Sequence, residues 1–225
     1  PAIWEAVFFS LTARVDSYMV SALGENAVAG VGITAQPKFL GMAVCIAANV
    51  ALSALVARRF GQQNRRDANR IVITGLLFIS VVTIFISIIA LVFAGNILDL
   101  CGATSETKDY GVTYFRIIMG GIIFNVLQMA INSAQRGIGN TRITMRTNVV
   151  SNILNIIFNY LLIGGNLGFP KLGITGAAIA TVLGTVVASI MSIASIAKKD
   201  CFINIGYMMT EKIKPSISAL KNITS

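Results

Sequence analysis

The sequence contains no histidine and few charged residues. Charged side chains make up 12% of its 225 positions, whereas hydrophobic residues make up 55%. An ordinary soluble domain carries about a quarter charged residues, so the composition excludes that class. The sequence also shows no paired carboxylates at short spacing, no nucleophile elbow and no phosphate-binding loop. These absences argue against a catalytic centre, and we expect that the protein is not an enzyme.

Cysteine is also scarce, with only Cys45, Cys101 and Cys201 scattered along the chain. An odd number at irregular spacing predicts neither a disulfide framework nor a metal site, and we expect no cofactor. The net charge of +9 would favour nucleic-acid binding in a soluble protein. Here the charges lie in short loops between apolar runs, which is typical of charges that orient a membrane protein. We therefore expect no nucleic-acid partner.

Long apolar runs dominate the chain. Residues 71–94 form 24 consecutive positions without a charge or a proline, where roughly 20 suffice to cross a bilayer. Six such spans are predicted, at residues 1–23, 27–57, 69–95, 110–134, 143–163 and 173–197. The predicted fold class is an all-α membrane protein with a six-helix transmembrane bundle, multi-pass and in contact with lipid. Residues 1–197 form this lobe, and residues 198–225 form a cytoplasmic linker segment.

The loops between these spans alternate in charge, and positive charge marks the cytoplasmic side of a membrane. The loops after the first, third and fifth spans carry few charges. The basic residues follow the second, fourth and sixth spans: Arg58, Arg59, Arg65, Arg66 and Arg70, then Arg136, Arg142 and Arg146, then Lys198, Lys199, Lys212, Lys214 and Lys221. This order predicts that both ends are cytoplasmic, and we expect a bacterial plasma membrane protein.

The fifth span carries a stripe of asparagines in the sequence NVVSNILNIIFNY. The asparagines stand at 148, 152, 155 and 159, a spacing of four, three and four that puts them on one helix face. Such stripes often hold membrane helices together through amide hydrogen bonds. We favour this packing role for Asn148 and Asn152, and for Asn155 and Asn159 the residues alone leave packing and function equally open.

Polar groups of three spans share one depth in the membrane. Measured from the outer ends of their spans at 1.5 Å per residue, Asp16, Asn155 and Thr181 lie about 12–13 Å deep and Asn159 about 8 Å deep. A carboxylate in a membrane span marks a functional site more often than a structural one. With the neutral oxygens of the other three residues, Asp16 would form a small hydrated pocket for a proton or a hard cation such as Na⁺.

Other polar residues within the spans are candidates for lining a cavity. Glu5 and Thr12 lie on the same helix face as Asp16, although Glu5 is also close enough to the cytoplasmic interface to be a surface group. In the second span the candidates are Gln36 and Lys38. The alternative to cation binding is an ion pair between Asp16 and Lys38. Arg14, two residues away on the helix, is a poor direct partner.

Four stretches resemble the multidrug and toxin extrusion (MATE) family of efflux transporters. They are VDSYMVSALGENAVAGVGIT at 15–34, ALVARRFGQQNRRDA at 54–68, RGIGNTRITM at 136–145 and NIIFNYLLIGGNLGFPKLGITGAAIATV at 155–182. They follow one another in the family's order and are distributed over most of the chain, from residue 15 to residue 182. The third stretch departs from the family pattern, because Asn140 stands where aspartate is usual.

The resemblance implies twelve spans in two lobes, with a substrate cavity between the lobes that opens alternately to each side. This chain is similar to the N-terminal lobe alone, so we expect a piece of a longer chain whose partner is the missing second six-helix lobe. The family's coupling residues match Asp16, Asn155 and Thr181. Asn159 stands where some members have an aspartate, which leaves Asp16 as the one carboxylate of the site.

The resemblance implies a secondary antiporter that uses H⁺ or Na⁺ to export organic, often cationic, small molecules such as drugs. The alternative within transport is a flippase for a lipid-linked oligosaccharide or peptidoglycan precursor, for which Arg14, Lys38 and Arg116 would bind the pyrophosphate. A different class is a membrane subunit without transport activity. The flippase alternative requires that these cations line a cavity.

Overall fold

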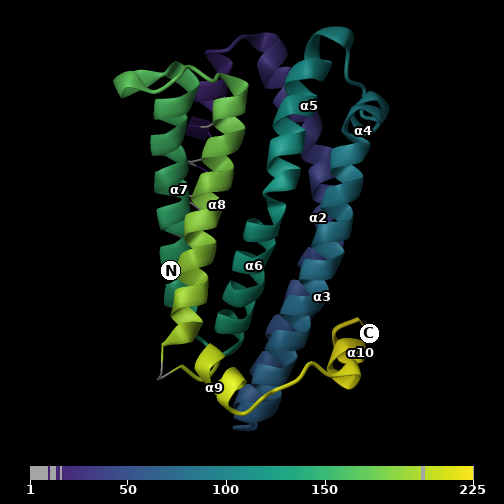
Figure 1. Cartoon of the computed structure of the whole chain (residues 1–225), viewed down its shortest axis with the longest axis vertical. Helices are drawn as coiled ribbons and strands as arrows, with labels where there is room; N and C mark the ends of the chain where they lie inside the picture. Colours follow the sequence, from purple (N-terminus) through teal and green to yellow (C-terminus); the bar gives the residue numbers. More distant parts are fainter. Residues whose placement is uncertain (1–9, 11–13, 16, 199–200, 225) are drawn as a thin grey trace.

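The computed structural model describes residues 10, 14–15, 17–198 and 201–224, and every regular element in these residues is helical. This confirms the predicted all-α class. The helices, shown in Figure 1, are α2 (Glu25–Gly61), α3 (Arg65–Val92), α4 (Ala94–Leu100), α5 (Ser105–Gly120), α6 (Ile122–Gly137), α7 (Thr141–Gly164), the 3₁₀ turn η1 (Asn166–Gly168), α8 (Ile174–Ala197), α9 (Ile205–Thr210) and α10 (Ile217–Thr224).

Four of these helices are long and apolar enough to cross a membrane, namely α2, α3, α7 and α8. They correspond to the second, third, fifth and sixth predicted spans. Pro37 lies inside α2, yet the helix is continuous over 37 residues. Most of the first predicted span lies outside the described residues, which include a helical stretch at 17–21.

The fourth predicted span is not one straight helix. It consists of α5 and α6, which meet at Gly121 with a bend of 48°. The bend brings Gly121 against α8, where an added Cβ would lie 2.6 Å from Val182 Cγ1. Ser87 of α3 donates a hydrogen bond to the carbonyl oxygen of Met119 at 2.7 Å, just before the bend. A glycine in close contact and an inserted hydroxyl are both recognised causes of helix kinks.

The helices form one bundle with its hydrophobic core among α2, α3, α5 and α6 (Figure 1). Leu52, Val72, Phe115 and Ala130 are fully buried members of this core. The hairpin of α7 and α8 lies on one side of the bundle and joins it mainly through α8, which packs on both α5 and α6. We call the end at which α2 begins the outer end and the opposite end the inner end, following the charge-based prediction.

Small residues let α7 and α8 approach closely. A Cβ on Gly176 would lie 2.5 Å from the carbonyl oxygen of Leu162, and one on Gly184 would lie 2.9 Å from that of Ser151. The close contacts at these two glycines show that the small residues of α8 serve packing against α7. The tight hairpin fixes the register of α7 against α8 and so places the polar side chains described below.

We expect that Gly176→Ala lowers the stability of the lobe. The new methyl group would press on the backbone of α7, which cannot rotate away as a side chain could, and overpacking of this kind costs about 1–3 kcal/mol. The midpoint of thermal unfolding of the purified protein measures the loss. Gly61→Ala is the matched control, because a Cβ there meets no atom within 4 Å. Equal midpoints for the two variants would contradict the packing role.

The segment after α8 is bound to the inner end of the bundle. Arg65 donates hydrogen bonds to the carbonyl oxygens of Cys201 and Phe202, at 2.8 and 3.1 Å. Asn69, which is fully buried, donates to the Phe202 carbonyl at 3.0 Å and accepts from the backbone N–H of Asn204 at 2.9 Å. Further along, α10 packs on α2 and α3. The predicted linker is therefore folded against this lobe.

Candidate functional site

Three of the four predicted coupling residues are joined by hydrogen bonds. Asn155 of α7 donates from Nδ2 to Thr181 Oγ1 of α8 at 3.1 Å, and Asn159 donates to Asn155 Oδ1 at 3.3 Å. Thr181 in turn donates to the carbonyl oxygen of Ala177 at 3.0 Å. Asn155 and Asn159 are 7% and 2% exposed. The shared depth expected from the sequence thus corresponds to direct contact between the two helices.

The helix geometry explains why these side chains meet. Asn155 and Asn159 are four residues apart and therefore lie one turn apart on one face of α7. On α8, Gly184 lies opposite that face, where an added Cβ would be 3.5 Å from Asn155 Cβ. The missing side chain lets the helices come close enough for Thr181, one turn nearer the outer end, to accept the amide hydrogen.

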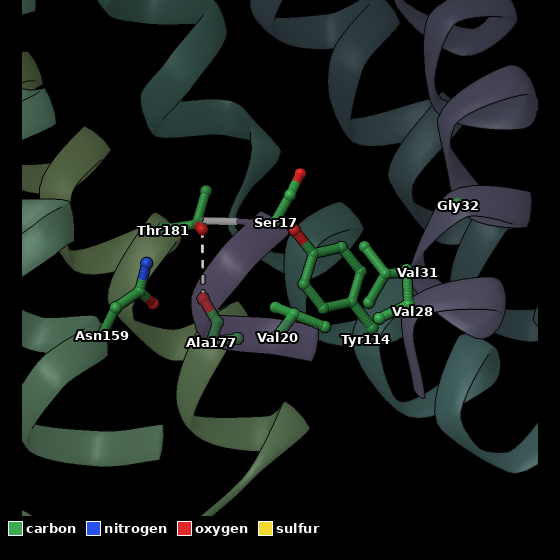
Figure 2. A pocket seen from close by; sticks show the side chains of 9 residues that line it. All are labelled: Ser17, Val20, Val28, Val31, Gly32, Tyr114, Asn159, Ala177 and Thr181. Atoms are coloured by element: carbon green, nitrogen blue, oxygen red, sulfur yellow. Dashed lines mark hydrogen bonds between the residues drawn. The ribbon is translucent and has the colours of Figure 1, made fainter. Parts of the chain in front are cut away.

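A cavity of about 180 Å³ adjoins this chain of hydrogen bonds (Figure 2). It lies between α2, α5, α7, α8 and the helical stretch at 17–21. The described residues that line it are Ser17, Val20, Val28, Val31, Gly32, Tyr114, Asn159, Ala177 and Thr181. Apolar side chains surround a few hydroxyl and amide groups, which is the composition of a typical small-ligand site.

Two hydroxyl residues of the cavity, Ser17 and Tyr114, were not among the predicted site residues. Figure 2 shows the Tyr114 ring beside Val28 and Val31 of α2. The sequence held a weak signal for Ser17, which directly follows the predicted coupling residue Asp16. For Tyr114 the only signal was an aromatic residue with a polar tip inside a span, and such residues are also common at membrane interfaces.

Five predicted site residues are not among the described residues that line the cavity. Glu5, Thr12 and Asp16 fall outside the described residues. Gln36 is exposed and Lys38 is partly buried, and neither lines the described cavity. The predicted role of Glu5, Thr12, Gln36 and Lys38 in lining a cavity stays a prediction, as does the coupling role of Asp16.

The deeper asparagines of the α7 stripe differ from each other. Asn148 accepts a hydrogen bond from Gln128 of α6 at 2.9 Å, as expected of a residue that joins helices. Asn152 makes no side-chain hydrogen bond among the described residues. Asn132 of α6, which is not part of the stripe, links α6 to both helices of the hairpin. It donates a hydrogen bond to Thr147 of α7 at 3.0 Å and accepts one from Ser192 of α8 at 3.2 Å.

The described lining of the cavity carries no formal charge. Its polar groups are hydroxyls and an amide, and in the described part of the chain no three acidic, cysteine or histidine residues are grouped to hold a metal ion. Arg14 and Arg116 are exposed and do not line the cavity. The cation cluster that the flippase alternative requires is thus not found at this cavity.

The chain is similar to known transporters over most of its length. A family model described as MatE matches residues 1–161. The probable multidrug resistance protein YoeA of Bacillus subtilis is 27% identical over 212 residues, which cover 88% of this chain and 46% of the relative. The chain thus spans about half the length of the curated relative that it matches.

Solved structures of transporters are also similar to this chain over most of its length. An outward-facing multidrug resistance MATE family transporter of the MOP superfamily superimposes with a TM-score of 0.85 at 28% identity, over 97% of this chain and 47% of the other. An inward-facing structure gives 0.84 at 29% identity, over 95% and 47%. Because the family model covers more than half of the sequence, the chain belongs to the MatE family, the multidrug and toxin extrusion transporters that its motifs resemble.

Proposed function

We propose that the chain is one lobe of a cation-coupled antiporter that exports organic small molecules, including drugs. The observation that carries the proposal is the hydrogen-bonded series from Asn159 through Asn155 to Thr181 beside a cavity within the membrane spans. Membership of the MatE family supports the transport of drugs.

Coupling in this proposal depends on one carboxylate. Asp16 binds H⁺ or Na⁺, while Asn155, Asn159 and Thr181 supply neutral oxygens and hold one another in place. Binding of the cation neutralises a charge that is costly inside the membrane. A ligand shifts a conformational equilibrium only through its differential affinity for the two states. Cation binding at this site therefore favours the conformation in which Asp16 is enclosed.

The second lobe in this proposal is a six-helix unit of the same protein, and the substrate binds between the two lobes. The similar TM-scores to the outward-facing and inward-facing structures support lobes that move largely as rigid bodies. The place of action is a bacterial plasma membrane. The folded segment 201–224 then moves with this lobe, because Arg65 and Asn69 hold it.

Ethidium efflux from cells that express the full-length protein tests the function. We expect that expression lowers the accumulated dye several-fold relative to cells that do not express the protein. Collapse of the coupling gradient should restore the accumulation. A protonophore and a sodium ionophore, added separately, identify the coupling ion. Dye levels that stay unchanged by expression for a panel of organic cations, anions and neutral drugs would contradict drug export. Efflux that persists without either gradient would contradict the coupling.

A further inference from the structure

Asn49 of α2 is a buried amide without a hydrogen bond. Its side chain is 3% exposed, and neither Nδ2 nor Oδ1 has a partner among the described residues. Asn132 of α6 has the same 3% exposure, but it donates to Thr147 and accepts from Ser192. A buried amide that makes no hydrogen bond is costly. The structure therefore holds α2 in a packing that leaves Asn49 unsatisfied, and such a group needs an explanation.

Two contacts between α2 and α3 bracket Asn49. Cys45, four residues earlier on the same face of α2, lies with its Sγ 3.4 Å from Thr83 Oγ1 of α3. Leu52, three residues after Asn49, packs on Gly75 of α3, where an added Cβ would lie 2.9 Å from Leu52 Cδ1. The Asn49 side chain thus lies at the interface with α3, one turn inward of the contact between Cys45 and Thr83.

Thr83 is a better acceptor than its present contact uses. Its hydroxyl donates to the carbonyl oxygen of Ile79 at 2.7 Å, so the Cys45 thiol is the donor in the contact with Thr83. A thiol is a weak donor, whereas an amide N–H is a strong one. Side chains in a helix tilt toward its N-terminus. Because α2 and α3 are antiparallel, the side chains of Asn49 and Thr83 tilt toward each other.

We propose that α2 has a second packing against α3, in which the Asn49 amide donates to Thr83 in place of the Cys45 thiol. The exchange needs an outward shift of α2 by about 1–2 Å, a common size for movements between packed helices. Glycines make such a shift feasible. Gly30 lies against Gly111 of α5, and Ser53 lies against Gly137 of α6, so no large side chains interlock at these two contacts.

The second packing changes the wall of the cavity. Val28, Val31 and Gly32 line the cavity from α2, which is one continuous helix from there to Asn49. A shift at Asn49 therefore moves these three residues as well. A ligand that fits one shape of the cavity better selects the corresponding packing. This link to transport rests on the proposed function, and a shift of this size is compatible with lobes that move largely as rigid bodies.

The S–H stretching absorption of Cys45 reports the exchange directly, because its frequency depends on hydrogen bonding of the thiol. The measurement uses the purified full-length protein in which every other cysteine, including Cys101 and Cys201, is replaced by serine. We expect two S–H bands, one for each packing, and Cys45→Ala should remove both. Asn49→Leu should leave only the band of the bonded thiol. A single band that Asn49→Leu leaves unchanged would overturn the proposal.

The thermal unfolding midpoint gives a second readout, whose sign distinguishes an unsatisfied amide from a bonded one. Asn49→Leu removes a buried polar group without breaking a hydrogen bond, so the midpoint should rise by about 2–4 °C. Asn132→Leu, the same change at a bonded asparagine, should lower it. Asn49→Val takes the place of the leucine variant if leucine is too large for the site. Midpoints that fall for both apolar variants of Asn49 would contradict the unsatisfied amide and overturn the proposal.

Dye export tests the link between the packing and transport. Asn49→Leu and Thr83→Val should each slow export about tenfold, equivalent to ~1.4 kcal/mol. The double variant should lose no more than either single one, because both changes remove the same hydrogen bond. Losses that multiply, or export at the wild-type rate in both single variants, would overturn this link. A full-length protein that shows both thiol bands but exports no dye would contradict the proposed function and leave the second packing standing.

Discussion

Replacing Asp16 with asparagine is expected to abolish cation-coupled efflux in the full-length protein. Asparagine has nearly the same shape but carries neither the negative charge that attracts a cation nor a carboxylate that takes up a proton. Loss of a charged ligand in a low-dielectric environment costs several kcal/mol, so coupled transport should drop by about 100-fold or more. Dye efflux driven by an imposed cation gradient measures the effect, with membrane expression checked in parallel.

Asp109→Asn is the control for this experiment. Asp109 is an exposed carboxylate near the start of α5, close to the outer end of the lobe. The same chemical change there should leave gradient-driven efflux within about twofold of the wild type, because an exposed charge interacts weakly with its surroundings. Coupled efflux that survives in Asp16→Asn would require another cation site, for which the proposed second lobe is the first place to search.

Periodic features of the sequence predicted the main helices well. The long apolar runs predicted α2, α3, α7 and α8 within a few residues, because each span must satisfy its backbone hydrogen bonds as a helix. The sequence did not predict the bend at Gly121. A glycine within a membrane span is compatible with a straight helix or a kinked one, and here the contact with Val182 on α8 accompanies the bend.

The sequence predicted those residues of the candidate site whose positions follow from spacing along a helix. Asn155 and Asn159 share a face, and Thr181 has a matching depth on the next span, so all three could be named from the sequence. Tyr114 could not, because its place at the cavity depends on how α5 packs against α2 and α8. Contacts between helices that are distant in sequence depend on side-chain packing, which a single sequence does not specify.

Asn155→Leu is the second change with a large expected effect. Asn155 donates to Thr181 and accepts from Asn159, so its loss removes both hydrogen bonds of the series and leaves the buried Asn159 amide without that acceptor. A buried polar group that loses its partner costs about 1–3 kcal/mol. We expect the half-saturating cation concentration to rise about 10- to 100-fold, measured by gradient-driven efflux over a range of Na⁺ concentrations and pH.

Asn152→Leu provides the matched control, because it makes the same substitution one turn deeper on the same stripe. Asn152 has no described side-chain hydrogen bond and is partly exposed, so this variant should keep the cation dependence of the wild type. If both variants lose coupling equally, the stripe acts as a whole, through the packing of α7. If only Asn155→Leu loses coupling, the effect depends on the hydrogen bonds to Thr181 and Asn159, as the coupling proposal requires.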